Sequence, residues 1–214
     1  MSPATKRSPV KAGSGSRHRE ILETAAKLVC EEGYEKASIQ RIADACGLTK
    51  AGLYHHIESK ESLLVQIMHH GMDIFEELVL SQVERIADPL ERLRLCMEKN
   101  VLLITRDRSK EITIILHESA TLRGEELARI NVRKKRYVRF LERSFAEAID
   151  AGAIRRIDPK VAAFAFLGAV NWIYKWFRSD GDVPEEQVVR GMQDIFFGGL
   201  EPGMRPVAAP GELQ

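Results

Sequence analysis

The sequence lacks the features that would indicate secretion, membrane insertion or a metal-dependent fold. It has only three cysteines, Cys30, Cys46 and Cys96, and this odd number, without CxxC spacing, argues against both a disulfide framework and a cysteine metal site. Its most apolar stretch, 161–174, is interrupted by Asn171 and is shorter than the roughly 18 apolar residues of a membrane span. We therefore expect a reduced, cytoplasmic protein with no membrane contact and no metal.

Net charge is also small, +1, so composition alone does not indicate a nucleic-acid-binding protein. Positive charge is nevertheless concentrated at one end, because residues 1–19 contain five Lys or Arg residues and no Asp or Glu. A basic end fits a polyanionic partner, although a solvated tail has the same composition. Residues 1–16 are rich in Ser, Pro, Lys and Gly and lack an apolar core segment, which predicts a disordered basic arm and no secretory signal.

No stretch alternates convincingly between apolar and polar residues with the period of two that is typical of a half-buried strand. Apolar residues instead recur at helical spacing along most of the chain. Helix starts, with an Asp cap followed by Pro, are indicated at Asp88-Pro89, Asp158-Pro159 and Asp182-Val183-Pro184. We predict an all-α protein of about nine helices.

The most informative segment is Ser38–Lys60, SIQRIADACGLTKAGLYHHIESK. Two short helices that cross through a tight turn need a small residue for close packing and a glycine at the turn, and Ala43 and Gly47 supply them. The apolar residues expected beneath the turn are Ile42, Leu48, Leu53 and Ile57. This pattern predicts a helix-turn-helix whose second helix, 49–56, enters the DNA major groove. A compact helical hairpin in some other all-α protein is the alternative.

The second helix of this motif carries side chains that suit a DNA surface. Lys50 can donate to guanine O6 and N7, and Ala51 can touch a thymine methyl. Tyr54, His55 and Lys60 can donate to phosphates, Lys60 from a helix N-terminus that itself favours anions. The expected DNA-binding residues are Ser38, Gln40, Thr49, Lys50, Ala51, Gly52, Tyr54, His55 and Lys60.

The stretch from about Ile21 to Leu64 resembles the DNA-binding domain of TetR-family repressors. It has a first helix that ends in Gly33-Tyr34, then a Ser/Thr cap, then IADACGLTKAGLYHHIESKESLL. The resemblance implies a homodimer, a palindromic operator in double-stranded DNA and an inducer bound in the C-terminal domain. The expected boundaries are 1–16 for the arm, 17–62 for the helix-turn-helix domain, 63–203 for a helical ligand-binding and dimerisation domain and 204–214 for a flexible tail.

The C-terminal segment 171–178, NWIYKWFR, with Gly181 and Pro184-Glu185-Glu186, is similar to the penultimate-helix signature of one TetR subgroup. The subgroup includes regulators of fatty-acid, phenylacetate and steroid-ring breakdown, and the similarity implies an acyl-CoA effector and no cofactor. The run 161–177 is apolar nearly all round, which predicts burial on more than one face. Two helices of this kind can pair with their copies as a four-helix dimer interface, with intramolecular core as the alternative. The expected interface residues are Trp172, Trp176, Val189, Met192 and Phe196.

Met and aromatic residues on the fourth to seventh helices can surround an apolar ligand, although such residues are also ordinary core. The basic run 133–136, RKKR, can meet CoA phosphates, but a solvated helix face is the simpler interpretation. The pair His117-Glu118 can be a polar anchor or a solvent-facing pair. The expected ligand-binding residues are Met68, Met72, Phe75, Ile114, His117, Glu118, Thr121 and Phe140.

No Ser/His/Asp or Cys/His arrangement or Gly-rich phosphate loop indicates catalysis, so we do not expect an enzyme. We predict a ligand-responsive transcriptional repressor that binds a palindromic operator as a homodimer and is released by a small apolar or acyl-CoA effector. The alternative is a DNA-binding or adaptor protein with no small-molecule inducer. A cavity of a few hundred Å3 in the C-terminal domain would favour the repressor over this alternative.

Overall fold

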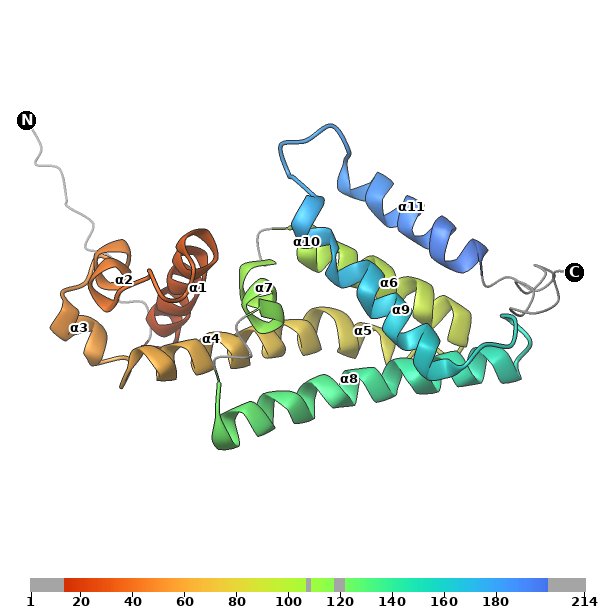
Figure 1. Ribbon diagram of the computed structural model, residues 1–214, viewed down its shortest axis with the longest axis horizontal. Coiled ribbons are helices and arrows are strands. Elements are labelled where there is room, and N and C mark those ends of the chain that lie inside the picture. The colour runs from red at the N-terminus through yellow and green to blue at the C-terminus, as the bar shows by residue number, and fades with distance from the viewer. Residues whose placement is uncertain (1–13, 107–108, 118–121, 200–214) are drawn as a thin grey trace, which may run out of the picture. The chain divides into compact units, whose positions relative to one another are not determined.

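The structure is a computed structural model that describes residues 14–106, 109–117 and 122–199 (Figure 1). These residues form helices and connecting turns without a strand, which confirms the predicted all-α fold class. The chain divides into two compact units between Ile67 and Met68. The helices are α1 (Ser14–Glu32), α2 (Ile39–Ala45), α3 (Lys50–Tyr54), α4 (Lys60–Phe75), the π-helix η1 (Glu76–Leu80), α5 (Ser81–Val83), α6 (Pro89–Thr105), α7 (Ser109–His117), α8 (Gly124–Asp150), α9 (Pro159–Asn171), α10 (Ile173–Trp176) and α11 (Glu185–Gly198).

Two longer helices are each divided by a local irregularity, so the structure has more labelled helices than the nine expected. From Lys60 to Val83, α4, η1 and α5 follow one another without a break, as the apolar periodicity predicted, but η1 widens the helix by one residue per turn. Trp172 alone separates α9 from α10. With α4, η1 and α5 counted as one helix, and α9 and α10 as another, the described residues contain the nine helices expected.

The first unit is a three-helix domain closed by the start of α4. Helix α1 buries Ile21, Ala25 and Val29, and it ends at Gly33, whose φ of +86° is favourable for glycine and strained for other residues. Its first residue, Ser14, falls within the arm expected at 1–16, and residues 1–13 lie outside the described part of the chain.

The second unit is built around α6. This helix packs against α8, α9, α10 and α11, and η1 and α7 also contact it (Figure 1). The largest side chains that are completely buried here come from α4, α6, α8, α9 and α11: Met68, Leu93, Met97, Phe145, Phe166 and Phe197. Because other helices pack against several sides of α6, its residues are in position to line a cavity inside this unit.

Two of the three predicted helix starts have the expected caps. Asp88 accepts a hydrogen bond from the backbone N–H of Glu91 at 2.7 Å, and Asp158 accepts from Lys160 and Val161 at 2.9 and 3.0 Å. The third start is correct in position but wrong in detail. Pro184 itself is the N-cap of α11, with no side-chain cap, because it lies one residue before the first helical position.

Within one chain, 161–177 is buried on one side only, so its expected burial on more than one face stays a prediction for the dimer. Helix α9 buries Ala162, Phe166 and Val170 on one side, whereas Phe164 and Trp172 are 52% and 62% exposed. An all-round apolar helix therefore has an open apolar face in one subunit, and the sequence pattern cannot distinguish that face from core.

The caps make a testable difference to stability. Asp88→Ala and Asp158→Ala should each lower the free energy of unfolding by about 1 kcal/mol, because each removes the acceptor for backbone N–H groups at a helix N-terminus. Asp182→Ala is the matched control and should leave it unchanged, since α11 has no side-chain cap. Urea titration followed by circular dichroism measures all three, and equal losses for Asp88 and Asp182 would contradict the assignment.

Candidate functional site

The helix-turn-helix is held by two hydroxyl caps. Ser38 accepts a hydrogen bond from the Arg41 N–H at 3.3 Å at the start of α2, and Thr49 accepts from the Gly52 N–H at 3.0 Å at the start of α3. Gly47, with a φ of +65°, makes the turn between the two helices. Of the apolar residues expected beneath the turn, Ile42, Leu53 and Ile57 are buried and Leu48 is half-buried; the small residue Ala43 is also buried.

The outer surface of α3 is polar and accessible. Lys50, Ala51, Tyr54 and His55 are all exposed on this helix. Gly52 is half-buried, and a Cβ added there would lie 3.2 Å from Thr49 Oγ1, so the glycine keeps space for the cap of its own helix. Its expected contact with DNA stays a prediction.

The remaining DNA-binding predictions fall on neighbouring elements. Gln40 is exposed on α2, where its amide donates to Asp44 at 2.8 Å. The Lys60 ammonium at the start of α4 donates to the Glu35 carbonyl at 3.3 Å and lies 4.4 Å from the centre of the Tyr34 ring. Lys60 therefore already stabilises the loop after α1, and a phosphate contact would be an additional role.

The second unit contains an apolar cavity of about 200 Å3. Helices α4, α6, α7, α8 and α9 all contribute to its walls, which places it inside the unit. Only four of the side chains that line it carry a polar group, and their positions give the cavity one polar part in otherwise hydrocarbon surroundings. The lining residues are Met72, Phe75, Asn100, Leu103, Ile104, Ile112, Ile115, Lys134, Tyr137, Val138, Leu167 and Asn171.

Asn100 and Tyr137 form the buried polar part of the wall. The Asn100 amide donates to Tyr137 Oη at 2.8 Å and to the Cys96 carbonyl at 2.7 Å, and Cys96 Sγ lies 3.3 Å from the same hydroxyl. Burial raises the pKa of the Cys96 thiol to about 12 and raises the pKa of Tyr137 well above its usual value. Both groups are thus neutral donors or acceptors at physiological pH.

Lys134 is the charged group of the wall. Its ammonium donates to the Ile115 carbonyl at 2.9 Å, and burial lowers its pKa. Its neighbours in the basic run face elsewhere: Arg133 pairs with Asp73 and Glu76 at 2.7 and 2.9 Å. The interpretation of 133–136 as a simple solvated face is therefore wrong for Arg133 and Lys134, whereas Lys135 and Arg136 are exposed as that interpretation expects.

The predicted ligand-binding residues agree only in part with this cavity. Met72 and Phe75 line it, whereas Met68, Ile114 and Phe140 are buried without lining it. Glu118 and Thr121 lie outside the described residues, as does the side chain of His117. Sequence analysis missed Asn100 and Lys134, and the only available signal was an Asn and a Lys among apolar residues on otherwise amphipathic helices.

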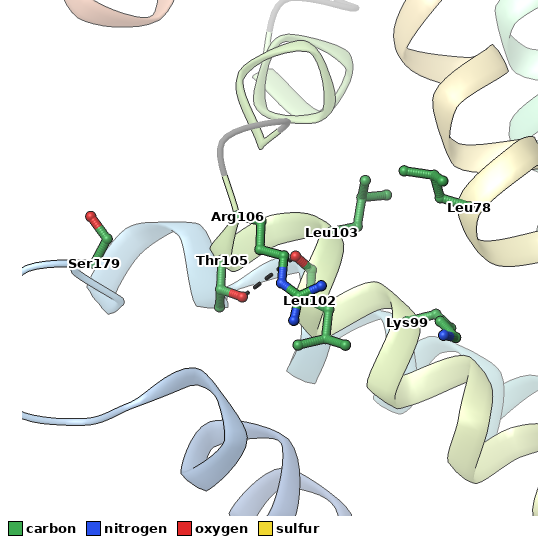
Figure 2. Close-up of a pocket in the computed structure, with 7 residues that line it drawn as sticks. All are labelled: Leu78, Lys99, Leu102, Leu103, Thr105, Arg106 and Ser179. Atoms are coloured by element: carbon green, nitrogen blue, oxygen red, sulfur yellow. Dashed lines mark hydrogen bonds between the residues drawn. The ribbon is translucent and has the colours of Figure 1, made fainter.

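A second hollow adjoins the cavity, because Leu103 lines both. We call it the basic groove; its volume is about 650 Å3. Figure 2 shows Lys99, Leu102, Leu103 and Thr105 on α6 and Arg106 directly after this helix, with Leu78 and Ser179 contributed by other segments. Unlike the cavity, this groove has two basic side chains at its surface.

An exposed apolar face covers α9 to α11. Besides Trp172, Trp176 is about half exposed and Ile195 is 81% exposed. Val189 is buried, and Met192 is half-buried. Phe196 is packed within its own chain, 5.7 Å from the ring of Phe166. Trp172 and Trp176 are thus accessible for the predicted dimer contact, and Ile195, which was not among the expected interface residues, is more open than the three predicted residues of α11.

Comparison with known proteins agrees with this architecture. The family profile "Bacterial regulatory proteins, tetR family" matches residues 21–67, and the profile "Tetracyclin repressor-like, C-terminal domain" matches residues 87–200, which is more than half of the chain. The chain belongs to the TetR family. The predicted family and its predicted class of function, a DNA-binding transcriptional repressor responsive to a ligand, are confirmed at this level.

Individual relatives match most of this chain. The HTH-type transcriptional repressor KstR2 of Rhodococcus jostii is 28% identical over 199 residues, 88% of this chain and 93% of that protein. The crystal structure of AibR in complex with isovaleryl coenzyme A and operator DNA is 60% identical, with a TM-score of 0.81, and the match covers 84% of this chain and 97% of that one. PfmR from Thermus thermophilus is 34% identical, with a TM-score of 0.77, over 85% and 98% of the two chains.

KstR2 and PfmR are transcriptional regulators by name. In the part of the chain that the structure describes, no helix has the length and apolar character needed to cross a bilayer.

The exposed position of Lys50 leads to a DNA-binding prediction. Lys50→Ala should weaken specific binding by about 1–3 kcal/mol if the ammonium reads a base edge, and random DNA should be affected much less. Lys60→Ala should weaken specific and random DNA alike and reduce the salt dependence. Gel-shift titrations at two salt concentrations measure both, with Lys135→Ala on α8 as the control. Unchanged affinity in both variants would contradict the site.

Proposed function

We propose that this TetR-family chain is a dimeric repressor that reads a palindromic operator through α3 and is released by a short-chain acyl-CoA thioester bound in its second unit. The observation that carries the proposal is the apolar cavity of about 200 Å3 in the unit that follows the helix-turn-helix. A DNA-binding or adaptor protein with no inducer would not need such a space. As a regulator of transcription, it would act in the cytoplasm, where bacterial DNA lies.

DNA reading is supported by the local geometry of α3. Its N-terminus is capped by Thr49, and three of its exposed residues, Lys50, Ala51 and Tyr54, can reach bases or phosphates. Two such helices in a dimer enter successive major grooves when they are about 34 Å apart. The similarity to AibR, which has been crystallised with operator DNA, supports the same use of the motif here.

The size of the cavity supports a short acyl group. A dry apolar cavity of about 150 Å3 is enough for a benzene-sized molecule, so about 200 Å3 fits an acyl chain of similar bulk and not a steroid nucleus or a long fatty acid. AibR, with 60% identity, has been crystallised with isovaleryl coenzyme A. The thioester oxygen of such a ligand is an acceptor, and the Lys134 ammonium in the cavity wall is a suitable donor.

Helix α4 provides the connection between ligand and DNA. Its first half, up to Ile67, belongs to the DNA-binding unit, and Met72 and Phe75 near its end line the cavity. A ligand that binds the dimer more tightly when α4 is in one position than in another shifts the population of DNA-competent dimers. A ligand with equal affinity for the two conformations would shift nothing. A coupling free energy of about 1–3 kcal/mol is ordinary for such a switch.

The dimer depends in this proposal on the exposed apolar face of α9 to α11. Ile195→Glu and Trp172→Glu should each give monomers, because burying an unpaired carboxylate costs about 3–5 kcal/mol. Val132→Glu is a matched control, since Val132 is an equally exposed apolar residue on α8. Sedimentation velocity measures the assembly and circular dichroism checks the fold. A folded, dimeric Ile195→Glu protein would refute this interface.

The effector is tested by calorimetry with isovaleryl-CoA, in the absence and presence of operator. We expect weaker binding when operator is present, by a factor of about 5–150, because linkage makes the coupling reciprocal. Val138→Phe should fill the cavity and abolish ligand binding while operator binding persists. Arg139→Ala, the exposed neighbour, should change neither.

Two results would contradict the effector proposal. Binding of the thioester with equal affinity with and without operator would show that it is not the inducer. Unaltered thioester binding to Val138→Phe would show that its acyl group lies elsewhere.

A further inference from the structure

The basic groove and the apolar cavity form two adjoining spaces of different chemistry. The cavity is almost entirely hydrocarbon, whereas the groove presents Lys99 and Arg106 together with the hydroxyls of Thr105 and Ser179 (Figure 2). Leu103 lines both spaces. A ligand with an apolar end and an anionic end matches the chemistry of this pair of spaces, which have Leu103 as a common wall residue.

The spacing of the two cations follows from helix geometry. Lys99 lies on α6 and Arg106, seven residues later, is the C-cap residue directly after this helix, so the two positions are separated by about two helical turns, roughly 10 Å along the helix axis. A coenzyme A molecule carries phosphate at two places, a 5′-diphosphate and a 3′-phosphate on the same ribose. Two cations separated along one groove therefore match a ligand with phosphate at two places, whereas a ligand with a single phosphate would need only one of them.

We propose that the basic groove holds the phosphorylated half of the coenzyme A ligand, with Lys99 and Arg106 as its phosphate contacts. This inference rests on the proposed function, because it assigns the part of the thioester that the apolar cavity cannot contain. Arg106 presents a planar set of donors that suits bidentate contact with a phosphate, and Lys99 presents a point charge.

Arg106 already has an anionic partner within the chain. Its guanidinium is hydrogen-bonded to the Glu185 carboxylate, with a closest distance of 2.8 Å, and Thr105 also donates to Glu185 at 3.2 Å. Glu185 is the first residue of α11, so the pair joins the end of α6 to the start of α11. A phosphate in the groove competes with Glu185 for Arg106. Ligand binding thereby loosens the attachment of α11, a helix of the exposed apolar face.

The test compares two thioesters that share one acyl group. Isovaleryl-CoA has the phosphates, and isovaleryl-pantetheine lacks them. The double variant Lys99→Ala/Arg106→Ala should bind isovaleryl-CoA about tenfold more weakly, the sum of two partly exposed ion pairs, while its affinity for isovaleryl-pantetheine stays within about twofold of the unaltered protein. The salt dependence of isovaleryl-CoA binding should fall in the same variant. Arg139→Ala is the control for loss of an exposed arginine.

Glu185→Gln separates phosphate binding from a structural role. Competition predicts that this variant binds isovaleryl-CoA several-fold more tightly, because Arg106 no longer has a charged partner, and that it leaves isovaleryl-pantetheine unaffected. A purely structural ion pair predicts the reverse for isovaleryl-CoA, a loss of affinity similar to that of Arg106→Ala.

The possible failures are distinguishable. If both thioesters bind and the double variant weakens them equally or not at all, the groove assignment is overturned and the proposed effector survives. If neither thioester binds to the unaltered protein, the proposed effector is wrong, and this inference is overturned with it.

Discussion

The hydrogen bond between the Asn100 amide and Tyr137 Oη is the interaction on which the second unit most depends. It joins α6 to α8 at a buried position, and the same amide also donates to the Cys96 carbonyl one turn earlier. A buried amide without its partners would cost about 1–3 kcal/mol, so the register of the two helices is strongly restrained. That register places Lys134 and Val138, one turn before Tyr137 and one residue after it, in the cavity wall.

A second constraint acts where α7 crosses α4. Gly71 is buried there, and a Cβ at this position would lie 2.8 Å from Ile115 Cδ1 and 2.9 Å from the Glu111 Cβ. Such close packing leaves little freedom for one helix to move without the other. Because Met72 and Ile115 both line the cavity, a molecule inside it would touch the two helices on either side of this contact. In the proposed switch, this contact would make the position of α4 depend on what the cavity contains.

The helix-turn-helix could be predicted almost completely because its determinants are local. The caps Ser38 and Thr49, and the turn at Gly47, act within three or four residues of their own positions, so their order in the sequence already specifies the geometry. The exposed surface of α3, which we propose faces DNA, follows from the same periodicity. What could not be predicted is the second role of Lys60, whose ammonium lies over Tyr34, because this contact joins residues 26 positions apart.

The cavity and the exposed apolar face of α9 to α11 were harder to predict, because periodicity shows which side of a helix a residue lies on but not what that side packs against. The basic run 133–136 shows the difficulty: its charges looked solvated, yet Arg133 pairs with Asp73, 60 residues earlier, and Lys134 turns inward to the Ile115 carbonyl. The apolar stripe of α11 shows the converse. Phe196 and Ile195 are adjacent and equally apolar, but one packs against Phe166 and the other is exposed. Only the crossing of α11 over α6 and α9 decides between them, and that crossing is a property of the whole core.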